Sequence, residues 1–253
     1  MGIFDIILAG LILCVAGIAQ SAVGFGYALF ATPLLLWIGI PLPDTITLVA
    51  TCSMGQAIIS ARKLREHVPW KLSLTATAVR VASVLIGLFL LKQLVTLDTS
   101  YIRLTIGCIL CLLTIIQLVW KTKTVQALHW GWAGLAFFSS GILAGICGMG
   151  GPPLVLWAMA QDWSTKKTRG FLFAVFATAI PIQLILLTIT FGTSILKDIA
   201  IGVAFIPLTF VNTAIGLPIG NRWPKKKLKR IAYATLLIIG VSAIVPSILN
   251  LIN

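Results

Sequence analysis

Apolar residues run almost without interruption along this chain, in stretches long enough to cross a lipid bilayer. A helix needs about 20 residues to span the hydrocarbon layer. Because the apolar runs are continuous and do not alternate with polar residues, they predict helices and not the strands of a membrane barrel. The chain is therefore predicted to be an all-α polytopic membrane protein, with apolar segments at 3–40, 44–61, 72–91, 102–120, 130–160, 170–191, 199–220 and 231–252.

The composition agrees with a membrane protein and argues against other classes. Of the 253 residues, 59% are hydrophobic and 10% are charged. The formal net charge is +13, but Lys and Arg lie in short connections, so we expect the lipid bilayer as a partner and no nucleic acid. The sequence contains no convincing metal-ligand cluster, nucleotide-binding loop or Ser/His/Asp set, so we expect no metal, no cofactor and no enzymatic activity. It leaves the oligomeric state open, a homodimer included.

The basic connections predict the orientation of the chain in the membrane. Cytoplasmic loops carry an excess of Lys and Arg. The connections without that excess, around 41–44, 98 and 197–198, should lie outside, and so should both termini. The connections rich in Lys and Arg, which should lie in the cytoplasm, are 62–71, 121–129, 161–169 and 222–230.

Two segments are predicted to enter the membrane and return. Segment 130–160 has basic connections on both sides, and its 31 residues are long for one span at 1.5 Å per residue. Its glycines Gly148-Met149-Gly150-Gly151 would permit a turn, and Gly24-Phe25-Gly26 does the same in segment 3–40. Three glycine pairs, 17/141, 24/148 and 26/150, share an offset of 124 residues. Both segments are therefore predicted as broken or re-entrant helical hairpins.

The predicted spans divide into two inverted-topology repeats within a single membrane domain. The first repeat starts outside and ends inside, and the second does the reverse. Counting each hairpin leg as a full span gives ten spans, and counting the legs as re-entrant gives six spans plus two hairpins; the sequence leaves both open. The N-terminal repeat, 1–120, contains hairpin 3–40 and helices 44–61, 72–91 and 102–120, and the C-terminal repeat, 130–253, contains hairpin 130–160 and helices 170–191, 199–220 and 231–252.

The two glycine clusters predict a substrate site. Secondary transporters bind substrate where helices are interrupted at corresponding positions of two repeats. The second leg of each hairpin begins with free N–H groups, which suit an anion. The alternative is that the glycines serve close helix packing. The residues expected to bind substrate here are Gly24, Phe25, Gly26, Gly148, Met149, Gly150 and Gly151, with the adjacent Cys147.

Arg80 is the charged residue that lies most clearly within a predicted span. It follows Lys71 by nine residues, which places it about 13 Å deep. An arginine at that depth costs several kcal/mol unless it is matched, and no acidic residue is an obvious partner. It shares a helix face with Ser73, Thr77 and Gly87. An unpaired guanidinium facing a cavity predicts a bidentate site for a small oxyanion, and the alternative is a cap on backbone carbonyls of a broken hairpin.

Other polar residues within the apolar segments are weaker candidates. Each could bind an oxyanion or could tie one helix to its neighbour. They are Gln20, Ser21, Thr51, Ser53, Thr77, Thr178 and Asn212.

The chain resembles the TauE/SafE family of sulfite and organosulfonate exporters. In each half a glycine-rich segment is followed by proline and leucine: Gly24-Phe25-Gly26 precedes Pro33-Leu34-Leu35, and Gly148-Met149-Gly150-Gly151 precedes Pro152-Pro153-Leu154. The family pattern is a fuller GxGGG, and here Tyr27 replaces one of those glycines.

The resemblance implies a permease of the bacterial inner membrane that moves small sulfur-containing oxyanions, usually outward. Alternating access around a midplane site would carry the anion across. An anion channel, or a permease for another small organic anion such as a carboxylate, is the alternative. The sequence leaves open the exact substrate, the direction, and the coupling to protons, exchange or membrane potential.

Overall fold

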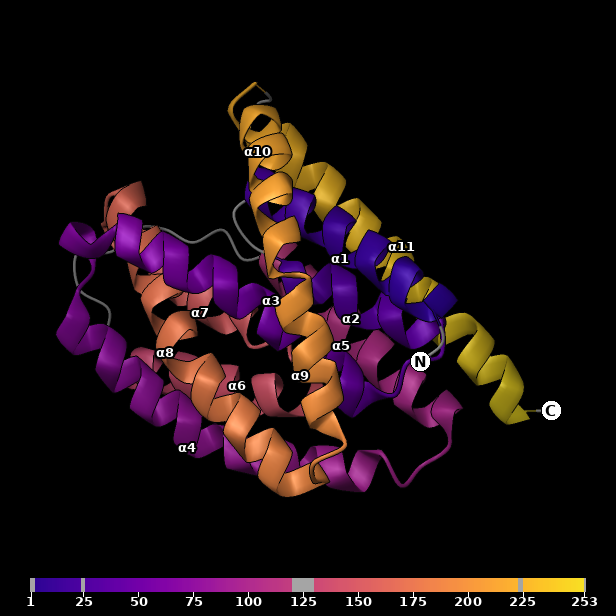
Figure 1. The fold of residues 1–253 in the computed structure, drawn as a ribbon. Helices are drawn as coiled ribbons and strands as arrows, with labels where there is room; N and C mark the ends of the chain where they lie inside the picture. The colour runs from indigo at the N-terminus through magenta and orange to yellow at the C-terminus, as the bar shows by residue number, and fades with distance from the viewer. Residues whose placement is uncertain (1–2, 24–25, 120–129, 223–224, 253) are drawn as a thin grey trace.

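The computed structural model describes residues 3–23, 26–119, 130–222 and 225–252 (Figure 1). Within these ranges the chain forms α-helices and one 3-10 turn, and no strand, so the all-α prediction is confirmed. The elements are α1 (Ile3–Val23), α2 (Tyr27–Trp37), α3 (Leu42–Lys63), η1 (Arg65–His67), α4 (Trp70–Leu94), α5 (Thr99–Val119), α6 (Trp130–Cys147), α7 (Gly151–Ala160), α8 (Thr165–Phe191), α9 (Ile195–Ala204), α10 (Ile206–Arg222) and α11 (Lys225–Ile252).

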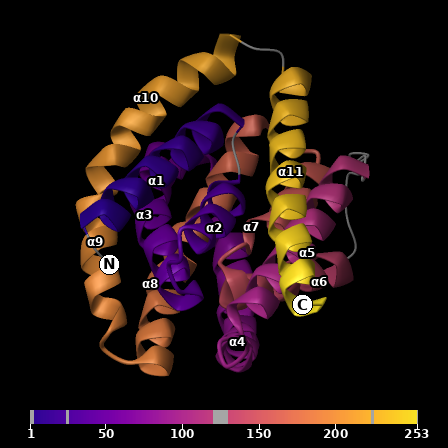
Figure 2. The ribbon, with the colours of Figure 1, turned by 90° about the vertical axis from the view of Figure 1, so that its right-hand side faces the viewer.

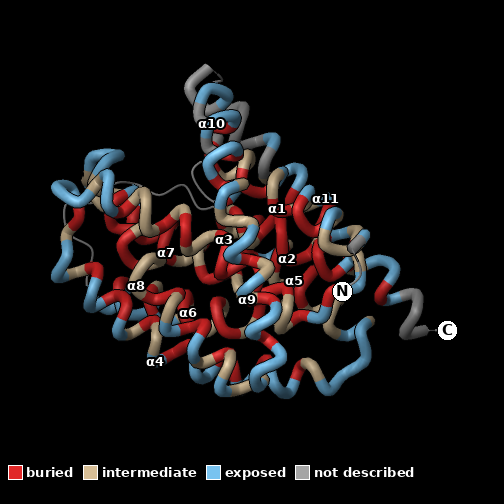
Figure 3. Tube along the Cα trace, viewed as in Figure 1, coloured by how far each residue is buried: buried red, intermediate tan, exposed pale blue. Residues whose placement is uncertain are grey.

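The chain is a multi-pass membrane protein. Among the described helices, α1, α4, α5, α6 and α8 are each long and apolar enough to cross a bilayer, and the bent pair α9 and α10 adds a sixth candidate span. Their outer faces carry large apolar side chains: Phe89 is 63% exposed and Ile189 is 74% exposed. Figure 3 shows exposed segments on the outside of the bundle around a buried interior. A surface so apolar requires lipid to cover it.

The segment expected as one helix at 199–220 is two helices in the structure. Helix α9 ends at Ala204, α10 begins at Ile206, and the two are bent by 41°. Pro207 lies in the first turn of α10, where its missing N–H removes no helical hydrogen bond and its fixed φ suits a helix start. The proline therefore accounts for a break that the continuous apolar pattern conceals.

The short helices α2 and α7 lie in the middle of the bundle, between α9–α10 on one side and α5–α11 on the other (Figure 2). Helix α3 runs beside α2, α8 and α9. Its Thr45, Thr47 and Thr51 are fully buried. The Thr47 and Thr51 hydroxyls each donate to a backbone carbonyl four residues earlier, at 2.8 Å. Their burial is tolerated because each hydroxyl has a carbonyl partner, Thr47 and Thr51 within α3 and Thr45 at Ile40, just before it.

Glycines set the distance between α4 and α6. A Cβ on Gly141 would collide with the Ser83 hydroxyl and the Arg80 carbonyl, and one on Gly145 would lie 2.7 Å from the Gly87 Cα. On α1, Gly17 approaches the Asn212 side chain of α10 in a similar way. Gly17 and Gly141 thus serve close helix packing, which fixes Arg80 beside the second glycine cluster.

Two groups of described connections lie at opposite ends of helix α8. At one end, Gly170 near the start of α8 lies against His67 and Val68, which follow α3. At the other end, Asp44 is near enough to Lys197 and Asp198 to interact electrostatically. Helix α8 has 27 residues, so about 40 Å separates its two ends. In Figure 1, η1 lies at the left, and the α4–α5 and α8–α9 turns lie at the bottom right.

Candidate functional site

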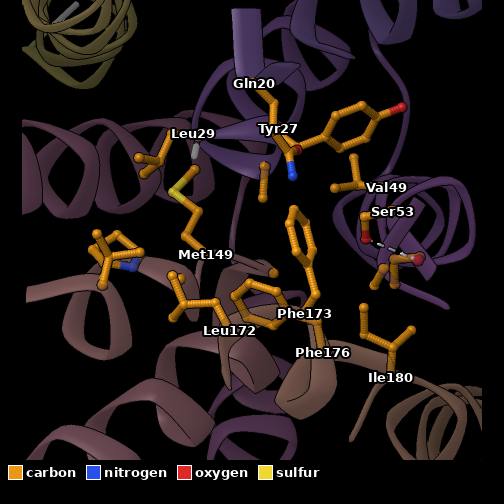
Figure 4. A pocket seen from close by; sticks show the side chains of 18 of the residues that line it. Gln20, Tyr27, Leu29, Val49, Ser53, Met149, Leu172, Phe173, Phe176 and Ile180 are labelled. Atoms are coloured by element: carbon orange, nitrogen blue, oxygen red, sulfur yellow. Dashed lines mark hydrogen bonds between the residues drawn. The ribbon is translucent and has the colours of Figure 1, made fainter. Parts of the chain in front are cut away.

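A cavity lies where the α1–α2 and α6–α7 breaks meet α3, α4 and α8 (Figure 4). It offers about 90 Å³ to the centres of water-sized molecules. One water needs about 10–15 Å³ by this measure, so several waters or one small anion fit. The lining residues are Gln20, Gly26, Tyr27, Ala28, Leu29, Ile46, Val49, Ala50, Ser53, Ala57, Arg80, Gly148, Met149, Gly151, Pro152, Val155, Arg169, Leu172, Phe173, Phe176, Ile180 and Gln183.

Arg80 brings a buried positive charge to this cavity. It lies ten residues into the 25-residue helix α4, about 15 Å from the helix start, and is only 3% exposed. Its Nε and Nη1 atoms have no hydrogen-bond partner, and no residue in the described part of the chain forms an ion pair with it. Its Cζ lies 5.0 Å from the ring centroid of Phe176. The guanidinium therefore has buried donors that no described protein group satisfies.

Helix α8 supplies one long wall of the cavity. Arg169, Phe173, Phe176, Ile180 and Gln183 recur every three or four residues, which places them on one helix face. The Gln183 Nε2 atom donates to the Ala144 carbonyl at 2.9 Å, so its carboxamide is held in place. This wall is mostly aromatic and aliphatic between its two polar ends.

The helix breaks form the opposite part of the cavity. Gly26 has φ +104° and Gly148 has φ +73°, and both lie in the left-handed region that favours glycine. Helix α2 starts with Tyr27, Ala28 and Leu29, whose N–H groups have no partner earlier in that helix. The first turn of α7 contains two prolines, so α7 presents fewer free N–H donors than the start of α2.

Seven of the predicted site residues line this cavity, and one more supports it. The Gly150 carbonyl accepts a short hydrogen bond from the Ser140 hydroxyl, and a Cβ on Gly150 would lie 3.1 Å from Arg80 Nη2. Figure 4 shows the Gln20 amide pointing toward Phe173. The seven that line it are Gln20, Gly26, Ser53, Arg80, Gly148, Met149 and Gly151. Gly24 and Phe25 lie outside the described residues.

Other predicted residues lie away from the cavity wall. The Thr77 and Thr178 hydroxyls form a 2.7 Å hydrogen bond that joins α4 to α8. Cys147 donates to the Leu143 carbonyl at 3.2 Å. Asn212 accepts from Cys14 at 2.9 Å. Thr51 bonds within α3. Ser21, which accepts from Gln56 at 3.4 Å, lines a neighbouring cavity.

Phe176 and Arg169 are among the lining residues that the sequence analysis did not predict. Phe176 gave no signal beyond its spacing on α8, because an aromatic residue in an apolar helix resembles any core residue. Arg169 was interpreted only as a loop charge that orients the chain. The three- and four-residue spacing from Arg169 to Gln183 is the signal that could have found both.

The fold and this cavity define a class: a multi-pass helical membrane protein with an unpaired cation inside the membrane, as expected of a protein that transports anions. The profile of the family described as Sulfite exporter TauE/SafE matches residues 8–243, and the chain therefore belongs to this family of transporters. It is 19% identical over 230 residues to the probable sulfite/organosulfonate exporter TauE of Cupriavidus necator, covering 90% of each chain. No solved structure matches the chain significantly.

Proposed function

We propose that this protein exports a small sulfur-containing oxyanion, sulfite or an organosulfonate, across the bacterial inner membrane. The observation that carries the proposal is the Arg80 guanidinium, buried, unpaired and at the wall of a cavity between two helix breaks. The family to which the chain belongs supports the substrate class.

The chemistry of the cavity suits such a ligand. An oxyanion can accept two parallel hydrogen bonds from one guanidinium, and this geometry is strong and directional. The surrounding Phe176, Leu172 and Met149 are apolar, so the attraction acts in a low dielectric. The bound anion would also offset the several kcal/mol that an unmatched arginine costs inside a membrane. The apolar wall leaves a surface against which the carbon chain of an organosulfonate would pack.

We further propose that the two halves are inverted repeats that move relative to each other. The proposal pairs α1–α5 with α6–α11, taking α9 and α10 together as the counterpart of α4. Under this pairing, the α4–α6 contact corresponds to the α1–α10 contact. In the same way, the α4–α8 contact corresponds to the α3–α9 contact. The α3–α8 and α5–α11 contacts map onto themselves. Such symmetry supports alternating access around the cavity.

The proposed orientation places the basic connections in the cytoplasm and both termini outside. Two of these connections, 62–71 and 161–169, lie against each other at one end of the bundle, as this orientation requires. A negative interior favours loss of an anion by about 2.3 kcal/mol per charge per 100 mV. Export therefore needs no separate proton-binding carboxylate.

Sulfite flux in proteoliposomes tests the proposal. We expect wild-type protein to move radiolabelled sulfite or an organosulfonate, and Arg80→Ala to lower the rate roughly 10- to 100-fold, because charge-assisted hydrogen bonds contribute about 1.5–3 kcal/mol. Arg80→Lys should retain part of the flux. Lys92→Ala is the matched control, since Lys92 is an exposed cation on the same helix outside the cavity.

Two results would contradict the proposal. One is a wild-type protein that transports neither sulfite nor any organosulfonate, or that transports carboxylates alone. The other is an Arg80→Ala variant that folds and transports like Lys92→Ala. A single-channel current in planar bilayers would instead support the anion channel.

A further inference from the structure

We infer that Arg169 is a second anion-binding residue, which takes the substrate from a separate vestibule and delivers it to Arg80. The inference rests on the proposed transport function and adds to it an entry site with its own residues. It follows from a second cavity that shares part of its wall with the first.

This vestibule lies beside the central cavity, between α1, α3, α8 and α10. It is the roomier of the two, with about 600 Å³ available to the centres of water-sized molecules. Gln20, Arg169 and Phe173 line both cavities, so the two spaces meet at these three side chains. Of the three, Arg169 alone carries a charge.

The vestibule is built to attract anions. Lys63 and Arg169 are its cations, and none of its described lining residues is acidic. Gln56, Ser60 and Ser21 add polar groups on α3 and α1. A cleft lined by one sign of charge, with low-dielectric walls, raises the local concentration of counter-ions. Anions therefore accumulate at Arg169 before they reach the central cavity.

The order of residues on α8 gives the path its direction. Arg169 precedes Phe176, whose ring faces the Arg80 guanidinium, by seven residues, so the Cα atoms of Arg169 and Phe176 are about 10 Å apart along the axis of α8. Phe173 lies between Arg169 and Phe176 on the same face of α8 and lines both cavities. An anion that leaves Arg169 must pass this ring before it reaches Arg80. The aromatic side chain separates a screened outer site from a desolvated inner one.

The vestibule is on the side of the basic connections. Lys63 ends α3, and Arg169 lies in the second turn of α8, where Gly170 contacts His67. In the proposed orientation this end faces the cytoplasm, where an exporter collects its substrate. Substitution of Arg169 should therefore raise the half-saturation concentration only for substrate that is presented from this side.

Side-specific kinetics test the inference. In inside-out membrane vesicles, we expect Arg169→Gln to raise the half-saturation concentration for sulfite about tenfold while the maximal rate stays within about twofold. The difference should shrink at 0.5 M salt, because exposed charges are screened over about 4 Å at that ionic strength. In right-side-out vesicles the same variant should match wild type. Arg169→Lys should restore most of the affinity.

Lys166→Gln is the matched control, because Lys166 is an exposed cation in the first turn of α8 and lines neither cavity. Arg169 is itself exposed, so its substitution should not impair folding, and thermal unfolding in detergent verifies this. The inference is overturned if Arg169→Gln behaves like Lys166→Gln, or if it lowers the maximal rate at an unchanged half-saturation concentration. In either case, loss of sulfite flux in the Arg80→Ala variant would still support the proposed function. Absence of wild-type flux would overturn both.

Discussion

Arg80 is stabilised by an aromatic ring, and no carboxylate among the described residues forms an ion pair with it. A carboxylate would have accepted its N–H donors and cancelled its charge. The Phe176 ring, 5.0 Å from the Cζ, attracts the cation through its face and uses none of the in-plane donors. Nε and Nη1 therefore stay free of protein partners. The ring thus offsets part of the cost of the buried charge without using the N–H donors that an anion would need.

Replacing Phe176 tests this arrangement. Phe176→Leu should raise the half-saturation concentration for sulfite roughly fivefold, since a cation–π contact of this kind contributes about 1 kcal/mol. Phe176→Tyr should keep the wild-type value, because the ring face remains. Phe89→Leu is the control, since Phe89 is 63% exposed on the outer surface of α4. Identical kinetics for Phe176→Leu and wild type, measured by vesicle flux, would exclude a role for the ring.

At the scale of helices, glycines perform two different tasks near the cavity. Gly141 and Gly145, spaced as GxxxG, let α6 approach α4 until backbone touches backbone. Gly26 and Gly148 instead adopt a positive φ at the helix breaks. Sequence spacing presents all four as one glycine-rich signal. Only the helix contacts separate those that pack helices from those that turn the chain.

Alanine substitutions on α6 distinguish these tasks. We expect Gly141→Ala to lower the free energy of unfolding by about 1–3 kcal/mol, because the added Cβ collides with Ser83 and with the Arg80 backbone. Gly134→Ala, on the same helix, should be neutral or slightly stabilising, since nothing lies within 4 Å of its Cβ position. Thermal unfolding in detergent measures both. Equal stability of the two variants would contradict the packing role of Gly141.

At the scale of the whole molecule, charge is distributed unevenly between the two ends of the bundle. The basic residues around 62–71 and 161–169 meet at one end, and Asp44, Lys197 and Asp198 meet at the other. Lys63 and Arg169 of the vestibule belong to the basic end. In the proposed orientation, positive charge at this end would both orient the chain in the membrane and concentrate the proposed anionic substrate.

Cysteine labelling tests this orientation. In a variant without the natural cysteines, Asp162→Cys should react with a membrane-impermeant maleimide only in inside-out vesicles. Ser194→Cys should react only in right-side-out vesicles, because it lies at the opposite end of α8; both positions are exposed. Labelling of both positions from the same side would contradict the proposed topology. Transport by each labelled variant provides the control for correct insertion.

Local properties of the chain were sufficient to predict much of this molecule. Long apolar runs specify membrane helices whatever they contact, because lipid requires every backbone group to be satisfied within the segment. A charge at mid-span is costly in any bundle, so Arg80 could be identified without knowledge of its neighbours. The glycines Gly26 and Gly148 mark the breaks because a positive φ is a property of one residue.

The composition of the cavity wall depends instead on how each helix is rotated about its axis. Thr77 and Arg80 are one turn apart on α4, yet Thr77 bonds to Thr178 while Arg80 lines the cavity beside Phe176. Phe176 and Arg169 acquire their roles only through contact with residues distant in the chain. Such rotations are set by the close approach of α4 to α6 and of α3 to α8, which no single segment encodes. The tertiary packing therefore selects, among many polar and aromatic residues, the few that meet the anion.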